Sequence, residues 1–338
     1  MAATLLRRLA AAFALPAVVL AAVVTGPVSP AAAAPDPEGG TKTLRAALES
    51  AAKGHILAKQ RLGASQKRQK ALQATILTTQ VEAKAMESQV RMVAGRAYRL
   101  GRFNTMRMLL NASSPDTFLE RAQGLDMMAR LDGKALARYR AAVDTYTRAN
   151  AALNLEIKEQ RKQVTILAKK KQEAENALAA AGGGAVAGGF VNANSPLAKP
   201  APRNSDGSWP TEKCTVDDPT TSGCITPRLL NAYQQARGAG FNHYTSCFSH
   251  RDSGEHPKGR ACDFAADKGG FGGTASGSSK TYGDRLAGYF VKNADRLGVL
   301  YVIWYRQIWM PSTGEWRSYS GRGSPSADHT NHVHLSVI

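Results

Sequence analysis

The first half of the chain carries a heptad pattern, which opens LRAALESAAKGHILAKQRLGASQKRQKALQATI at residues 44–76. Taken in alternating steps of four and three, the pattern runs from Leu44 to Leu100, and 13 of its 17 positions are apolar. Apolar residues sustained at this spacing over many turns are typical of a coiled coil. The pattern therefore predicts one long helix whose apolar seam packs against a partner helix.

A second seam of the same spacing runs from Leu136 to Leu178, with ten of 13 positions apolar. Two consecutive helices of similar length pair most simply in antiparallel fashion. We therefore expect a coiled-coil hairpin over residues 41–180. Residues 101–135 break the heptad, and Ser114-Pro115 is typical of a helix start. This predicts a helical tip at 101–135, which either seals the end of the coiled coil or docks a partner.

The N-terminal segment, residues 1–34, has the pattern of a secretory signal peptide. Arg7 and Arg8 precede an uncharged apolar run, and the small residues 31–34 offer a cleavage site. The alternative is a retained membrane anchor, because the run is close to the shortest length that spans a bilayer. The signal peptide predicts a secreted, extracellular protein.

The four cysteines all lie in the C-terminal part of the chain. An even number of cysteines in an exported chain predicts disulfides, and four cysteines allow three connectivities. Our hypothesis pairs sequence neighbours, Cys214 with Cys224 and Cys247 with Cys262. A zinc site made of four cysteines is the alternative, but the usual C-x2-C spacing is missing.

Residues 181–210 are rich in Ala, Gly and Pro, which predicts a flexible linker. Beyond it, Thr226-Pro227 is typical of a helix start, and the apolar run 299–305 predicts a buried strand. We therefore expect an all-α antiparallel coiled-coil hairpin followed by a small α+β domain, residues 211–338, with an antiparallel sheet.

Six of the seven histidines follow residue 242, and two groups of them suggest metal chemistry. His256 precedes Asp263 by seven positions, and His332 and His334 stand near the chain end. A catalytic zinc ion needs about three nitrogen or oxygen ligands and one open position. His256, Asp263 and one C-terminal histidine supply such a set. On an expected terminal strand His332 and His334 share a face, so one would bind metal and the other would assist.

The pattern His256-x-x-Gly259-x-Ala261-x-Asp263, followed by His332-x-His334, resembles the zinc peptidases of the D-alanyl-D-alanine carboxypeptidase, lysostaphin and hedgehog superfamily. The VanY-like and murein endopeptidase branches, which cut peptidoglycan peptides, are the most similar. The resemblance covers about residues 210–338. It implies that His256, Asp263 and His334 bind Zn²⁺.

The same resemblance implies roles for three further residues. His332 would assist the zinc-bound water or stabilise the oxyanion, and His329 matches a histidine of the murein endopeptidase branch. Arg251 is the candidate for holding a substrate carboxylate or the transition state. The chain departs from the carboxypeptidase pattern at Asn331, where a Glu is usual, and at Gly254, where a Ser is usual.

The hairpin sequence has a weaker resemblance of its own. Ala97–Gly101, followed by Leu109-Leu110 and Phe118–Arg121, is similar to the hairpins that precede hydrolase domains in bacterial division-associated wall hydrolases. There such hairpins regulate or localise the enzyme. The resemblance implies a membrane or division-complex partner.

The net charge of +18 is concentrated in the hairpin, because residues 35–181 contribute +12. For an exported chain we expect anionic wall polymers or a membrane surface as partners, and no nucleic acid. The expected function is a secreted peptidase of peptidoglycan stem peptides with a regulatory or localising coiled coil. The alternative is a non-catalytic cell-wall-binding scaffold, or an activator that recruits other wall hydrolases.

Overall fold

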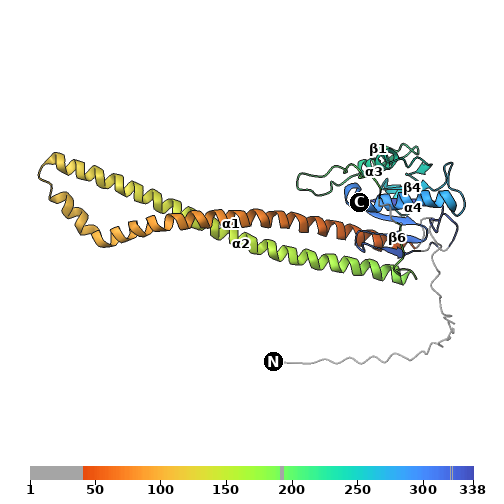
Figure 1. Ribbon diagram of the computed structural model, residues 1–338, viewed down its shortest axis with the longest axis horizontal. Coiled ribbons are helices and arrows are strands. Elements are labelled where there is room, and N and C mark those ends of the chain that lie inside the picture. The colour runs from red at the N-terminus through yellow and green to blue at the C-terminus, as the bar shows by residue number, and fades with distance from the viewer. Residues whose placement is uncertain (1–40, 191–193, 320, 322) are drawn as a thin grey trace, which may run out of the picture. The chain divides into compact units, whose positions relative to one another are not determined.

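The computed structural model describes residues 41–190, 194–319, 321 and 323–338. The predicted signal peptide, residues 1–34, lies outside this part of the chain. The described chain forms two long helices that pack together, followed by a small domain with antiparallel sheets (Figure 1). This is the fold class that the sequence predicts.

The hairpin consists of α1 (Lys42–Leu110) and α2 (Pro115–Ala180). α2 begins where the sequence predicts, because the Ser114 hydroxyl accepts a hydrogen bond from the Thr117 amide and proline occupies the first turn. Residues 101–110 belong to α1 and residues 115–135 to α2, with a short connection at 111–114, and they do not form a separate helical tip. α1 continues through that region and is interrupted at Gly101, whose φ of 57° suits a residue without a β-carbon.

The predicted seam of α1 faces its partner, since Ala58, Ser65 and Thr79 are all buried. The two seams meet at Gln69, whose Oε1 accepts a hydrogen bond of 2.7 Å from Gln160 Nε2.

Parts of the second seam are predicted one position too late along the chain. Val143 and Val164 are 38% and 55% exposed, whereas the residues before them, Ala142 and Gln163, are buried. A seam of 3.5 residues drifts around a helix of 3.6 residues per turn, so a strict heptad loses its register over many turns.

The described residues of the linker region lie against the domain. The Ala198 amide donates to Asn293 Oδ1, and the Ala201 amide donates to the Arg296 carbonyl, both over 2.8 Å. The Phe190 ring packs against Trp316, with ring centroids 5.0 Å apart. The composition predicted a flexible linker. The composition does not reveal these contacts, in which the domain supplies hydrogen-bond partners for the backbone of an irregular segment.

The described part of the domain contains two sheets, three helices and one 3₁₀ turn. Its elements are β1 (Val216–Asp217), β2 (Cys224–Ile225), α3 (Pro227–Gly238), β3 (Thr245–Ser246), η1 (His256–Lys258), β4 (Ala261–Ala265), α4 (Gly277–Lys292), α5 (Ala294–Leu297), β5 (Val299–Trp304), β6 (Gln307–Trp309), β7 (Trp316–Ser318) and β8 (His332–Val337). β1 pairs with β2, and the larger sheet has the order β3-β4-β8-β5-β6-β7. The terminal strand β8 is therefore an inner strand of this sheet.

The two faces of the larger sheet are chemically different. On one face Phe264, Val333 and Leu335 belong to a core shared with α3 and α4. Successive side chains on a strand point to opposite faces. Asp263, His332 and His334 consequently occupy the other face. That second face also carries Tyr301 and Ile303 of β5, which pack with Leu48 and Ala51 of α1.

Two disulfides join the cysteines as the sequence hypothesis paired them. Cys214 is bonded to Cys224, and Cys247 to Cys262. Disulfides of this kind persist in oxidising compartments outside the cytoplasm. Within the described ranges, none of the helices has an apolar stretch long enough to cross a membrane.

Candidate metal centre

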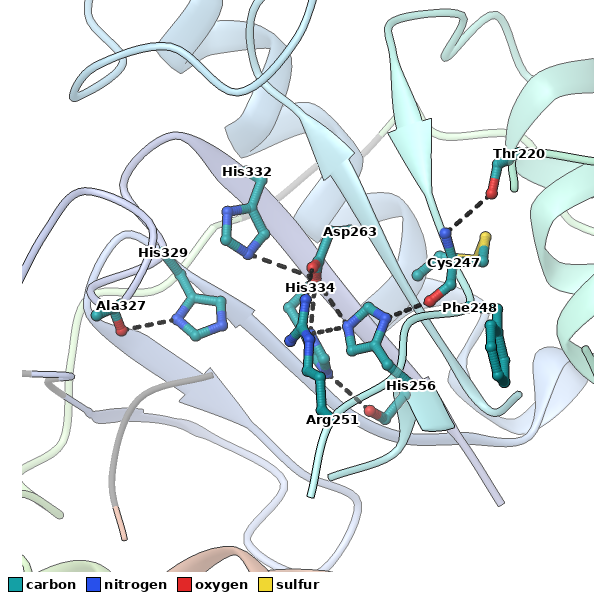
Figure 2. A network of polar contacts seen from close by, with 12 residues as sticks. Thr220, Cys247, Phe248, Arg251, His256, Asp263, Ala327, His329, His332 and His334 are labelled. Carbon is teal, nitrogen blue, oxygen red and sulfur yellow. Dashed lines mark hydrogen bonds and ion pairs between the residues drawn. A yellow bond between two sulfur atoms is a disulfide. The ribbon is translucent and has the colours of Figure 1, made fainter. Parts of the chain in front are cut away.

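Three buried side chains converge on the polar face of the sheet (Figure 2). Asp263 on β4 and His334 on β8 are direct cross-strand neighbours, and His256 is the first residue of η1, the turn before β4. One potential ligand atom from each residue lies within 4.8 Å of the other two. These are the three residues expected from the sequence as metal ligands.

The donor atoms form a compact cluster around the Asp263 carboxylate. Its Oδ1 lies 2.8 Å from His334 Nδ1 and 3.2 Å from His256 Nε2. Burial by itself would raise the pKa of Asp263, but the charges and hydrogen bonds of His256 and His332 hold that pKa well below its usual value. Two imidazoles and one ionised carboxylate form a group that can hold a metal ion.

Outer contacts orient the two imidazole rings. The Cys247 carbonyl accepts a hydrogen bond from His256 Nδ1, so the Nε2 of that ring faces the cluster. His334 Nε2 contacts Ser336 Oγ at 2.8 Å, so its Nδ1 faces the cluster, and the Tyr301 ring stacks on His334 at 5.6 Å. Such partners fix the tautomer and orientation of metal-binding histidines.

Sequence reasoning missed these supporting residues. Ser336 was the one that a pattern could have indicated, because it stands two positions after His334 on the same face of the strand. The roles of Tyr301 and the Cys247 carbonyl depend on contacts between segments far apart in the chain.

His332 lies beside the three convergent side chains, with its Nε2 3.4 Å from Asp263 Oδ1. The amide nitrogen of Asn331 donates to the Gly272 carbonyl and to Ser326 Oγ. The amide oxygen of Asn331 is therefore the atom that accepts from His332 Nδ1, over 2.7 Å. This bond turns His332 Nε2 toward the centre.

His329 is also buried at this centre. Its ring centroid is 4.7 Å from that of His332, and its Nδ1 is hydrogen-bonded to the Ala327 carbonyl. Burial, together with the charges of His332 and His334, lowers the pKa of His329 well below its usual value. Its Nε2 has no hydrogen-bond partner among the residues that the structure describes.

Arg251 reaches the centre from the loop before η1, with its Nη2 3.4 Å from Asp263 Oδ2. In the same loop, Gly254 has a φ of 90°, in the left-handed region that favours glycine. The carboxypeptidase pattern has a serine at the corresponding position.

Two other C-terminal histidines lie outside this cluster. The His243 ring stacks on Tyr282 at 3.6 Å, and its Nδ1 contacts the Ala266 carbonyl. His250 packs against the Phe248 ring. The concentration of histidines in the sequence thus reflects the centre only in part.

Comparison with known proteins gives one match. Residues 221–330 are similar to the family model described as VldE, C-terminal domain. This range covers about a third of the chain; it includes His256 and Asp263 and ends before β8. Neither the curated proteins nor the solved structures include a match to this chain. The resemblance to VanY-like peptidases stays a prediction from the motif.

Proposed function

We propose that this chain is an exported, zinc-dependent peptidase that hydrolyses peptide bonds in peptidoglycan stem peptides. The observation that supports the proposal most is the convergence of His256, Asp263 and His334 at one buried position. The same position is flanked by His332 and Arg251, which have the chemistry to assist a hydrolysis. A structural role alone does not require a carboxylate buried among several imidazoles, since burying such groups is costly.

The donor set fits zinc. His256, Asp263 and His334 supply two nitrogens and one oxygen, and three protein ligands leave a position open for water or substrate. When bound there, Zn²⁺ would polarise the scissile carbonyl and lower the pKa of a coordinated water.

His332 is the proposed general base. Because Asn331 accepts from its Nδ1, Nε2 is the nitrogen that faces the centre, and it would take a proton from the attacking water and return it to the leaving amine. The usual carboxylate of the carboxypeptidase branch is absent at position 331. The amide of Asn331 orients His332 but adds no negative charge beside the ring.

His329 and Arg251 complete the proposed catalytic set. The neutral His329 presents an acceptor nitrogen beside His332, which suits it to order a water molecule there. The Arg251 guanidinium binds Asp263 and is partly exposed, so it is placed to hold a substrate carboxylate.

The hairpin is proposed to localise or regulate the peptidase. The charge of +12 on residues 35–181 favours attraction to anionic wall polymers or lipid headgroups outside the cell, and a membrane or division-complex partner is compatible with that role. The two disulfides and the signal-like N-terminus support a secreted, cell-wall-associated protein.

The test combines metal analysis with muropeptide digestion. The purified full chain should contain stoichiometric zinc and cleave muropeptides, and His256→Ala should do neither. His243→Ala is the matched control, because it removes a histidine of the same domain outside the centre. Stoichiometric zinc with unchanged muropeptides would favour the wall-binding scaffold or activator. A wild-type chain that binds no zinc would refute the proposal.

A further inference from the structure

The N-terminal end of α1 contacts the turn that carries His256. Glu49 of α1 accepts from Lys258 Nζ through Oε2, over 2.9 Å, and from Arg260 Nη2 through Oε1, over 2.7 Å. Lys258 ends η1 and Arg260 immediately precedes β4. One carboxylate of the hairpin therefore binds two side chains of the segment between two proposed ligands, His256 and Asp263.

A second carboxylate, from the residue that precedes η1, belongs to the same charge cluster. Glu255, which directly precedes His256, is 1% exposed and pairs with the same two cations, at 3.0 Å to Lys258 and 2.5 Å to Arg260. Two carboxyl groups and two cations thus form one network. A buried polar group such as the Glu255 carboxyl needs its partners in fixed positions, because desolvated polar groups without partners are costly.

α1 also contacts the loop that precedes η1. Arg45, one turn before Glu49, donates to Ser253 Oγ over 2.6 Å. The apolar side chains of Leu48 and Ala51 are buried against the sheet face that carries His334. α1 is consequently packed against the domain beside the metal centre.

On the side away from α1, η1 packs closely against the β1–β2 segment. Gly259 has φ 65°, and a β-carbon there would lie 2.8 Å from the Cys224 carbonyl oxygen of the β1–β2 sheet. The Thr226 amide also donates to the Gly259 carbonyl. The turn is enclosed between the disulfide-linked β1–β2 segment and α1.

We propose that Glu49 is a positioning residue for the metal centre: through Lys258 and Arg260 it holds η1 so that His256 faces Asp263 and His334. The hairpin is then part of the structure that sets metal affinity, in addition to any localising role. This inference rests on the proposed metal centre.

α2 supplies a matched control for the test. Its Glu175 forms an ion pair of 2.9 Å with Arg317 of β7, and Arg317 also pairs with Glu315. The side chains of Glu49 and Glu175 are 23% and 28% exposed. Each therefore joins the hairpin to the domain through a carboxylate of similar exposure, but β7 is three strands away from β8 in the sheet.

The experiment measures zinc affinity of the full chain by competition with a chromophoric chelator, and the visible absorption of the Co²⁺-loaded protein. Glu49→Ala should weaken zinc binding by about 5-fold, less than the 10–100-fold typical of direct outer partners of a ligand. It should also shift the Co²⁺ bands, which report ligand geometry. Glu175→Ala should leave both readouts unchanged.

The possible outcomes separate this inference from the proposed function. Equal effects of the two substitutions, or unchanged affinity and spectrum in Glu49→Ala, would overturn the positioning role while leaving the metal centre intact. A wild-type chain that binds no zinc would overturn both. If Glu49→Ala fails to fold, the isosteric Glu49→Gln decides by the same two readouts.

Discussion

Asp263 and His334 face each other across the central strands β4 and β8, with Oδ1 and Nδ1 2.8 Å apart. Both residues lie within paired strands, so the hydrogen-bonded backbone fixes the distance between them. Ligands on regular elements hold their geometry better than ligands on loops. The third ligand, His256, lies on a short turn and depends on neighbouring segments for its position.

Replacing the carboxylate of this pair should abolish tight metal binding. In Asp263→Asn the amide lacks the negative charge, so we expect zinc affinity to fall by more than the roughly 100-fold loss seen for outer partners. Metal content by elemental analysis and chelator competition measure this. Asp217→Asn, at the exposed end of β1, is the control and should bind zinc as wild type does. Equal affinity in Asp263→Asn would remove Asp263 from the ligand set.

Restoring a carboxylate beside His332 should change the pH dependence of the proposed reaction. In Asn331→Asp an anion would replace the amide oxygen 2.7 Å from His332 Nδ1. A neighbouring anion favours the protonated ring, so the acidic limb of the pH–rate profile should move to higher pH by about one pH unit. An unshifted limb would show that His332 is not the base whose titration limits the reaction.

The backbone at His329 gives a prediction about stability that is independent of catalysis. His329 has φ 52°, a conformation that costs about 1–2 kcal/mol for a residue with a β-carbon. His329→Gly should therefore unfold at a higher temperature than His329→Ala, by about 2–4 °C for each kcal/mol of relief. Thermal unfolding followed by circular dichroism compares the two variants. An alanine variant as stable as the glycine variant would indicate that the loop relaxes.

The contact between α1 and η1 should weaken in acid. Burial would raise the pKa of Glu49, but hydrogen bonds from Lys258 and Glu255 and the charges of Lys258 and Arg260 lower it to about 2 from an ordinary 4.5. A lowered acid pKa stabilises the folded state above the unfolded value, and this contribution is lost as pH falls from about 4.5 toward 2. The other charged groups around this network are Lys42, Arg45, Asp252 and Glu255.

Denaturant unfolding of the metal-free chain measures this effect. Wild type should be more stable than Glu49→Gln at pH 6, and the difference should shrink below pH 4.5. The control is Glu87→Gln, which breaks an exposed pair with Arg91 and should show little difference at any pH. A difference between wild type and Glu49→Gln that does not vary with pH would contradict the assigned pKa.

Local patterns in the sequence predicted many of the elements correctly. The Ser114-Pro115 and Thr226-Pro227 helix starts, the seam of α1 and the buried strand at 299–304 all follow from side-chain spacing and capping, which act over a few residues. The register of α2 failed at Val143 and Val164, because the face that a helix buries depends on the partner that it meets.

The chemical types at the centre were set by the sequence, which placed two imidazoles and a carboxylate at His256, Asp263 and His334. Only the tertiary structure decided that β8 pairs with β4, that Asn331 turns His332 inward, and that Glu49 of the hairpin contacts the turn beside His256. The physical reason is the sequence distance over which each interaction acts. Capping, turn formation and strand alternation are properties of neighbouring residues, whereas ligand geometry arises when segments more than 70 residues apart are packed against one sheet.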